Sequence, residues 1–545
     1  MPHDGLPTVT RSVGIGNRLL ATLPPADIAL LAPELEGVAL DQDAVLARAG
    51  DEVEHVFFPH SGAISLMIDM ANGQTVATAA IGCEGAVGIL SALGPSPSAI
   101  TAIVHAAGTA SRIPASRFRA AFNRSPVLRH ALQAHLSAML TQFQLGAACN
   151  ALHPVQVRMA RWLLNLSDHI DHDVLPLTQE ALSQILGVRR TTVTLLMRNL
   201  RASGAIRSDR RGQIEIDRSR LAAVACECHE TMRLEVDGSA STNTARSRFL
   251  GVGDDERVSL GALVARSGKD YSVTAHPTNV GNRLLAALPP ADLGLLTPHF
   301  QKISFEPDAM LVRSGDELDQ VYFPHSGAIA FMVDMPNGQT VATTLMGREG
   351  ALASLSVLGP SRSSVTAIVR VAGTASRISA AKFRLAYARS AAIRQVVQVH
   401  ARTLLLQLQH VAACNALHRV EGRMARWLLQ IHDRVPDDAL PLTQEALAQL
   451  LGVRRTTVTL TMSKLRVAGA IRSDRRGFVE VDRTRLESVA CECYALMQRR
   501  IDRISCQELS APRLALALLQ ESSFVTSGEA GEDRAEIKAA SPVRE

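Results

Sequence analysis

The chain has 545 residues, 47% of them apolar and only 3% aromatic, and a net charge of +5. This length predicts several domains with aliphatic cores. There is no run of about 20 apolar residues to span a membrane and no apolar signal-peptide core at the amino terminus, so we expect a cytoplasmic protein.

An internal repeat organises the chain from about residue 16 to residue 229. Each position of this segment has its counterpart 265 positions later without an insertion, as in Trp162 and Trp427 or Cys228 and Cys493. A solenoid would repeat a much shorter unit, so this pattern indicates the duplication of a complete folding unit of about 210 residues.

Residues from about 38 to 113 predict β-structure in the first copy. Val53–Phe58, Ala63–Met70 and Gln74–Ile81 are apolar runs, and Asn72–Gly73 is a signal for a two-residue hairpin turn. The second copy repeats the signal at Asn337–Gly338. Many short strands with glycine turns predict a small antiparallel β-roll or barrel.

Helical segments follow from about residue 114 to 149, with an apolar stripe at a spacing of three to four residues. The stripe comprises Leu128, Leu132, Leu136, Met139 and Phe143, and in the second copy Ile393, Val397, Leu404, Leu408 and Val411. Such a long helix can pair with its twin. It can also pack only on its own β-domain. We favour the pairing.

The segment Leu177–Gly212, repeated at Leu442–Gly477, predicts a helix-turn-helix with a basic wing. Thr178 is a candidate N-cap, Leu182 and Leu186 recur at helical spacing, and Gly187 stands where the chain must turn sharply. We expect the second helix to run from about residue 189 to 200. A β-hairpin should follow, with arginines at its tip.

The exposed start of that second helix faces base edges in a helix-turn-helix. Arginine can donate two hydrogen bonds to guanine, and threonine can bond bases or touch the thymine methyl. Arginines of the wing would contact phosphates. The predicted DNA-binding residues are Arg189, Arg190, Thr191, Thr192, Thr194, Arg198, Arg210 and Arg211, with Arg454, Arg455, Thr456, Thr457, Thr459, Arg475 and Arg476 in the second copy.

Charge supports this assignment. Segments 189–220 and 454–485 each hold nine Arg or Lys and three Asp or Glu, which makes each segment +6 and leaves −7 for the rest of the chain. The alternative is a solvated arginine-rich helix face. DNA binding is favoured because charge, turn glycine and helical spacing coincide twice.

Six of the eight cysteines occupy matching places in the two copies, and Cys83 and Cys506 have no counterpart. A disulfide framework is not expected in a cytoplasmic chain. Cys226 and Cys228, with Cys149 and His153, could form a thiolate metal or redox site. One-residue spacing is unusual for zinc, so ordinary reduced cysteines are favoured, and neither a metal nor a cofactor is predicted.

The order of β-roll, long helix and winged helix-turn-helix resembles the CRP/FNR family of bacterial transcription regulators. The motifs that carry the resemblance are VxxRMAxWLL at Val155–Leu164, LTQEAL at Leu177–Leu182 and LGVRRTTV at Leu186–Val193. PHSGAI at Pro59–Ile64 and ACEC at Ala225–Cys228 resemble one subgroup. The resemblance covers both copies.

The resemblance implies a homodimer-like arrangement on two-fold symmetric DNA. The family's guanine-reading arginine falls on Arg190 and Arg455. The glutamate that usually follows it is Thr191 and Thr456 here, and a second arginine is replaced by Leu195 and Leu460. The usual target sequence of the family should therefore not be assumed.

The resemblance also implies residues for an effector. A cyclic nucleotide would be held by a glutamate at its ribose and an Arg–Ser pair at its phosphate, which corresponds to Glu349, Arg362 and Ser363 in the second copy. The first copy has Glu84, but Pro97 stands where the arginine would be. The alternative is a roll that serves as a scaffold. The cysteine cluster of the iron–sulfur branch is absent before Cys83.

We therefore predict an α+β chain with two copies of a jelly-roll-like antiparallel β-roll, each with a long dimerisation-type helix and a winged helix-turn-helix. The expected parts are an amino-terminal extension (1–16), cyclic-nucleotide-binding-like roll and helix (17–149), winged helix-turn-helix (150–229), linker (230–281), second roll and helix (282–414), second winged helix-turn-helix (415–511) and disordered tail (512–545).

The predicted function is sequence-specific transcription regulation through double-stranded DNA, read as an inverted repeat. An intramolecular pseudo-dimer and a homodimer of two chains both fit, and RNA polymerase is a further candidate partner. A sensor that acts through protein contacts is the alternative. An enzyme is not expected, because no catalytic motif stands on a suitable strand–helix unit.

Overall fold

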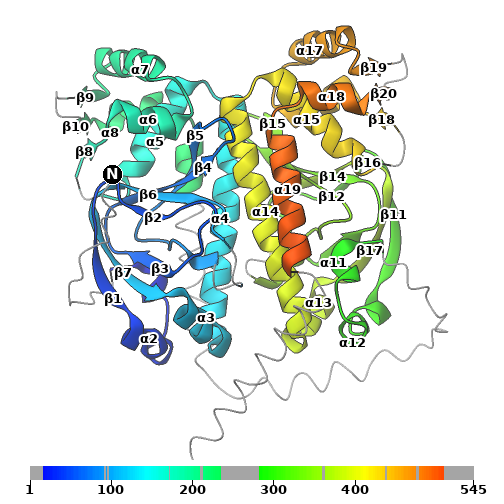
Figure 1. Cartoon of the computed structure of the whole chain (residues 1–545), viewed down its shortest axis with the longest axis horizontal. Coiled ribbons are helices and arrows are strands. Elements are labelled where there is room, and N and C mark those ends of the chain that lie inside the picture. The colour runs from blue at the N-terminus through cyan, green and yellow to red at the C-terminus, as the bar shows by residue number, and fades with distance from the viewer. Residues whose placement is uncertain are drawn as a thin grey trace, which may run out of the picture.

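The computed structural model describes residues 16–234 and 281–508, with gaps at 91–93, 95–96, 171, 209–212, 359–361, 436–437 and 474–477. Within these residues the chain forms two copies of one α+β unit, as predicted. The two copies lie side by side (Figure 1). The predicted tail lies outside the described residues. So does the predicted linker, except for residues 230–234, which are still helical, and residue 281.

Each β-roll consists of two antiparallel sheets. In the first copy their strand orders are β1-β7-β3 and β2-β6-β4-β5, and in the second β11-β17-β13 and β12-β16-β14-β15. The first roll contains β1 (Glu36–Leu40), β2 (Val45–Ala47), β3 (His55–Pro59), β4 (Ala63–Asp69), β5 (Thr75–Ile81), β6 (Thr101–Ala106) and β7 (Gly108–Pro114). The second contains β11 (Gln301–Phe305), β12 (Met310–Val312), β13 (Gln320–Pro324), β14 (Ala328–Asp334), β15 (Thr340–Met346), β16 (Thr366–Val371) and β17 (Gly373–Ser379).

The hairpin between β4 and β5 corrects one detail of the prediction. Met70 N donates to Gln74 O over 2.9 Å, so the loop comprises residues 71–73 and is one residue longer than the predicted two-residue turn. Gly73 has φ 80° and Gly73 N donates to Met70 O. A turn followed by a left-handed residue is the usual three-residue hairpin loop, and glycine adopts that conformation without strain.

Short helices flank each roll before the long helix begins. They are α1 (Arg18–Ala21), α2 (Pro25–Leu31), η1 (Ala32–Glu34) and α3 (Ala115–Arg124), and in the second copy α11 (Arg283–Ala286), α12 (Pro290–Leu293), η4 (Thr297–His299), η5 (Ser354–Leu358) and α13 (Ala380–Arg389). The long helices are α4 (Pro126–Leu152) and α14 (Ala391–Leu417). Ser125 caps α4 by accepting from Leu128 N, and α4 ends at Leu152, followed by the C-cap residue His153 and by Pro154.

The long helices α4 and α14 pack against each other within the one chain (Figure 1). Asn150 Nδ2 donates to Ala412 O, and at the equivalent position Asn415 Nδ2 donates to Ala147 O, each over 3.0 Å. Equivalent positions therefore meet, so the helices run parallel about a pseudo-twofold axis. The apolar stripe serves both predicted purposes: Leu404 and Leu408 join the core around α4, whereas Ile393 and Val397 pack inside the second roll.

A winged helix-turn-helix follows each long helix. The first comprises α5 (Val155–Ser167), β8 (Val174–Pro176), α6 (Gln179–Leu186), α7 (Arg190–Ala202), β9 (Ile206–Ser208), β10 (Gln213–Ile216) and α8 (Arg218–Val224). The second comprises α15 (Val420–His432), β18 (Ala439–Pro441), α16 (Gln444–Leu451), α17 (Arg455–Val467), β19 (Ile471–Ser473), β20 (Phe478–Val481) and α18 (Arg483–Val489), and α19 (Cys493–Glu508) then packs along α14. No helix of the described residues is long and apolar enough to cross a membrane.

Each winged domain is docked onto the outer face of its own roll. Ile64 and Leu66 on β4 face the core of the roll, while Ala63 and Met67 pack with Trp162 of α5. Strand β4 is therefore buried on both faces, and its alternate residues belong to different cores. This explains why the strand reads as a continuous apolar run instead of an alternating one.

A partly buried ion pair joins the winged domain to the roll in each copy. Glu84 lies 3.3 Å from His169, and its counterpart Glu349 accepts from Arg434 Nε over 3.1 Å. Burial alone would raise the pKa of Glu84, but His169 and backbone amides hold this pKa at about 2. Burial alone would lower the pKa of His169, but Glu84 raises it above its ordinary value.

The pair in the first copy should make its docking dependent on pH. A histidine whose pKa is raised on folding stabilises the fold fully below its unfolded pKa of 6.5, and this stabilisation is lost as the pH rises through the folded pKa. Replacing His169→Arg copies the second-copy residue, which stays charged. We expect the melting temperature of the variant to exceed that of the wild type increasingly above pH 6.5, as measured by thermal unfolding between pH 6 and 9.

The reciprocal change Arg434→His is the matched control, because it should introduce the same pH dependence into the second copy. A difference in melting temperature between His169→Arg and wild type that stays constant across this range would contradict a stabilisation that depends on the protonation of His169.

Candidate nucleic-acid interface

The helix-turn-helix forms as the sequence predicts. Thr178 Oγ1 accepts from Ala181 N over 3.0 Å and caps α6, and Gly187 ends that helix at φ 64°. A side chain at Gly187 would be strained and would also collide with Leu417 of α14. Val193 is fully buried between the two helices. Helix α7 begins at Arg190 and ends at Ala202, two residues beyond the predicted end.

The start of α7 presents most of the predicted residues to solvent. Arg189, Arg190, Thr191, Thr194 and Arg198 are exposed. In the second copy Arg454, Arg455, Thr456 and Thr459 are exposed likewise, whereas Thr192 and Thr457 are half-buried. Thr192 was predicted to be exposed, but its side chain is partly covered beside Val193, which is fully buried.

Two glutamines that the sequence reasoning missed belong to the same surface. Thr194 Oγ1 donates to Gln179 Oε1 over 2.9 Å, and Thr459 Oγ1 donates to Gln444 Oε1 over 3.0 Å. Each glutamine directly follows the capping threonine of α6 or α16, and this position is the only signal in the sequence. The bond orients the amide at the edge of the recognition helix.

The recognition arginines carry unbalanced positive charge. Among the described residues, the guanidinium groups of Arg189, Arg190, Arg454 and Arg455 form no ion pair. Leu195 and Leu460 lie one turn further along and are 54% and 61% exposed. An exposed cationic surface with an apolar side chain beside it suits a groove that offers guanine acceptors and thymine methyl groups.

The wing is present on both domains. Strand β10 pairs antiparallel with β9 and with β8, and β20 pairs with β19 and β18 in the same way. The predicted tip arginines, which are Arg210, Arg211, Arg475 and Arg476, lie outside the described residues. The recognition helices α7 and α17 lie at the same end of the molecule, one on each side of the paired long helices (Figure 1).

The residues predicted for an effector have other partners. Glu349 is engaged by Arg434, Arg362 Nη1 donates to Gly315 O over 3.0 Å, and Ser363 Oγ donates to Val365 O over 2.7 Å. Arg362 also lies 3.7 Å from Glu317. Binding of a cyclic nucleotide at Glu349, Arg362 and Ser363 stays a prediction, and Glu349 would have to accept from the ribose beside or in place of Arg434.

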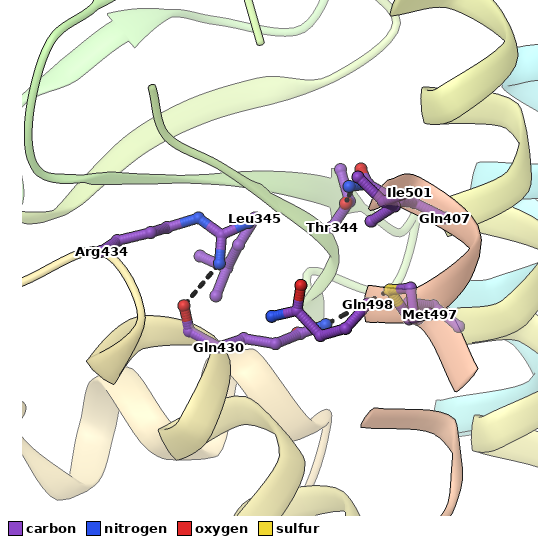
Figure 2. Close-up of a pocket in the computed structure, with 9 residues that line it drawn as sticks. Thr344, Leu345, Gln407, Gln430, Arg434, Met497, Gln498 and Ile501 are labelled. Atoms are coloured by element: carbon purple, nitrogen blue, oxygen red, sulfur yellow. Dashed lines mark hydrogen bonds between the residues drawn. The ribbon is translucent and has the colours of Figure 1, made fainter. Parts of the chain in front are cut away.

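A small polar cavity lies beside this ion pair, between β15, α14, α15 and α19 (Figure 2). Its volume is ≈ 20 Å³, which is room for about one water molecule. Gln430 and Arg434 border it, with Gln407, Met497 and Gln498 opposite. A nucleotide needs a cavity of at least about 300 Å³, so this space is not an effector pocket.

Comparison with known proteins agrees with this architecture. Residues 157–224 and 422–489 match the Crp-like helix-turn-helix domain, and residues 38–125 and 302–390 match the cyclic nucleotide-binding domain. The chain is 29% identical over 206 residues to a CRP-like cAMP-activated global transcriptional regulator from Mycobacterium tuberculosis, a match that covers 36% of this chain and 91% of that protein.

Among solved structures, the c-di-GMP-responsive global regulator CLP from Xanthomonas campestris is 17% identical with a TM-score of 0.31, and the match covers 35% of this chain and 99% of that one. A CRP/FNR-family transcriptional regulator from Thermus thermophilus is 20% identical with a TM-score of 0.29, over 35% and 98% of the two chains.

Each half of the chain thus contains both domains of such a regulator, in the same order, with the recognition helix exposed. The chain belongs to the CRP/FNR family of DNA-binding transcription regulators, as a tandem duplication in which each cyclic nucleotide-binding domain is followed by a Crp-like helix-turn-helix domain, and not to a family of enzymes.

Proposed function

We propose that one chain binds an inverted-repeat DNA site as an intramolecular pseudo-dimer. The observation that carries the proposal is the identity of the two exposed reading surfaces. Residues 189–195 and 454–460 have the same sequence, RRTTVTL, and they sit on helices related by the pseudo-twofold axis between α4 and α14. Two identical reading helices related in this way match two identical half-sites of opposite orientation.

The half-sites should be centred about 34 Å apart, one turn of the DNA helix, so that both recognition helices enter the major groove on the same face. Arg190 and Arg455 each contact one guanine per half-site through two hydrogen bonds. Leu195 and Leu460 favour a thymine methyl at their positions. Arg189, Arg198 and Arg454 hold phosphates, as do the wing arginines, and these contacts position the protein without reading sequence.

The arginine contacts can be tested with single and double variants. Arg190→Ala should weaken binding to the selected site by about 1–3 kcal/mol, roughly 5- to 150-fold, and Arg455→Ala should do the same. The double variant should lose its preference for guanine in both half-sites. Fluorescence anisotropy at a fixed salt concentration measures these affinities, since phosphate contacts make affinity salt-dependent.

Arg117→Ala is the matched control, because Arg117 is an exposed arginine on α3 at the opposite end of the molecule. Equal losses in Arg190→Ala and Arg117→Ala would contradict base reading by α7. Uniform weakening on all sequences would mean that Arg190 contacts phosphate only.

The number of chains on the DNA tests the pseudo-dimer separately. Sedimentation velocity with a duplex that carries one inverted repeat should give one chain per duplex, because both reading helices are supplied by the same chain. A duplex with a single half-site should bind far more weakly with the same stoichiometry. A complex that contains two chains per inverted repeat would contradict the pseudo-dimer and would indicate a homodimer of two chains.

A further inference from the structure

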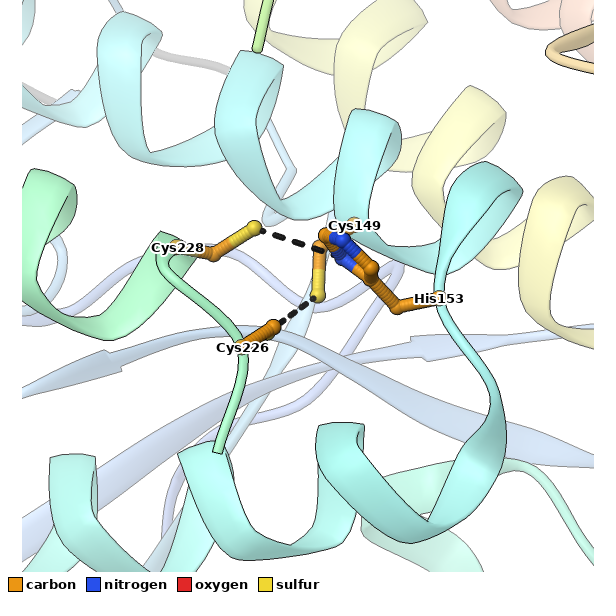
Figure 3. A group of neighbouring side chains, drawn as sticks. All are labelled: Cys149, His153, Cys226 and Cys228. Atoms are coloured by element: carbon orange, nitrogen blue, oxygen red, sulfur yellow. Dashed lines mark hydrogen bonds between the residues drawn. The ribbon is translucent and has the colours of Figure 1, made fainter. Parts of the chain in front are cut away.

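Four side chains from distant parts of each copy converge at the end of the long helix. Cys149 lies in the last turn of α4, His153 directly follows that helix, and Cys226 and Cys228 come from the segment after α8. Their ligand atoms all lie within 4.8 Å of one another. Figure 3 shows the four side chains pointing toward one another. Cys414, His418, Cys491 and Cys493 form the same cluster in the second copy.

The spacing of these atoms fits a tetrahedral metal ion. Zinc binds thiolate sulfur at about 2.3 Å and imidazole nitrogen at about 2.0–2.1 Å, which places neighbouring ligand atoms roughly 3.5–3.8 Å apart. Cys149 Sγ lies 3.6 Å from Cys226 Sγ, and Cys228 Sγ lies 3.5 Å from His153 Nδ1. The corresponding distances in the second copy are both 3.5 Å.

The outer ring nitrogen of each histidine lies near a carboxylate, which is the usual neighbour of a histidine that binds a metal. His153 Nε2 lies 3.4 Å from Glu227 Oε1, and His418 Nε2 lies 3.2 Å from Glu492 Oε2. A nearby carboxylate favours the tautomer that carries its proton on Nε2, and this tautomer leaves Nδ1 with a free lone pair toward the three sulfurs. Asn337 of the second roll donates to Glu227 over 3.2 Å and holds this carboxylate in place.

Buried arginines supply the opposite charge. A divalent cation with three thiolates and one neutral histidine has a net charge of −1. Arg158 and Arg161 on α5 are each 3% exposed and lie close enough to Cys149 to interact with it electrostatically. Their buried Nε atoms have no hydrogen-bond partner in the described structure, and neither have those of Arg423 and Arg426. An anionic centre would offset the cost of burying these cations.

We propose that each half of the chain holds a thiophilic divalent cation, Zn²⁺ in the first instance, through three cysteines and one histidine. With four protein ligands the sites are closed, as structural zinc sites are. Each would join the end of the long helix to the last segment of its winged domain. The proposal departs from the sequence prediction of ordinary reduced cysteines, because only half of the ligands come from the Cys-x-Cys pair and Cys149 stands 77 residues before Cys226.

The test uses the full chain, purified without oxygen, stripped of metal and titrated with Co²⁺ as a spectroscopic probe. We expect two Co²⁺ per chain, with thiolate-to-cobalt charge-transfer absorption that Zn²⁺ abolishes by displacement. Cys228→Ser and Cys493→Ser should each reduce the stoichiometry to one, and the double variant should bind none. The retained site in each single variant shows that the chain is still folded.

Cys83→Ser is the matched control and should keep two sites, because Cys83 is outside both clusters. Glu227→Gln should keep the stoichiometry and weaken one site by roughly 10- to 100-fold. Absence of cobalt absorption in the wild-type chain would overturn the proposal, as would a double cysteine variant that still binds two ions, or a stable Cys149–Cys226 disulfide in the anaerobic chain. The readout needs no DNA, so it is independent of the proposed function.

Discussion

The parallel pairing of α4 with α14 is the contact on which the rest of the arrangement depends. It combines a shared apolar core with two equivalent hydrogen bonds, from Asn150 to Ala412 O and from Asn415 to Ala147 O. A buried asparagine amide tolerates only the register in which it finds its partner, so these bonds select one alignment of the helices. Because each winged domain follows one of these helices, this alignment also relates the two winged domains by the same pseudo-twofold axis.

Each long helix ends at a joint where several forces hold the winged domain. The domain shares an apolar core with the outer face of the roll. An ion pair also joins the two domains, formed by Glu84 and His169 in the first copy and by Glu349 and Arg434 in the second. Arg158 and Arg423 donate to the last carbonyls of α6 and α16. The cysteine clusters occupy the same joint. The orientation of the recognition helices is therefore decided by buried polar contacts, which are directional, and not by apolar packing alone.

Fusion of two copies lets the halves differ while the reading surface stays the same. Arg198 corresponds to Ser463 and Asn199 to Lys464, so the helices diverge after the residues that face the bases. Lys464 pairs with Glu421, whereas Asn199 bonds Gln156. In two separate identical chains each of these changes would occur twice. Within one chain, the residues that face the bases can remain identical in the two halves while the residues near phosphates differ. The ion pair between roll and winged domain can likewise contain a titratable histidine in one half and an arginine in the other.

The sequence by itself determined the duplication, the order of the domains, the helix-turn-helix and the arginines of its exposed face. These features depend on local signals: a capping threonine, a glycine at positive φ, helical periodicity and net charge within about 35 residues. The tertiary structure alone decided the partners of residues that are far apart. It directed Glu349 to Arg434, lengthened the Asn72–Gly73 loop by one residue, tied Gln179 to Thr194, and gathered Cys149, His153, Cys226 and Cys228. Such contacts depend on how helices and sheets dock, and no pattern along the chain records which distant side chain docking brings near.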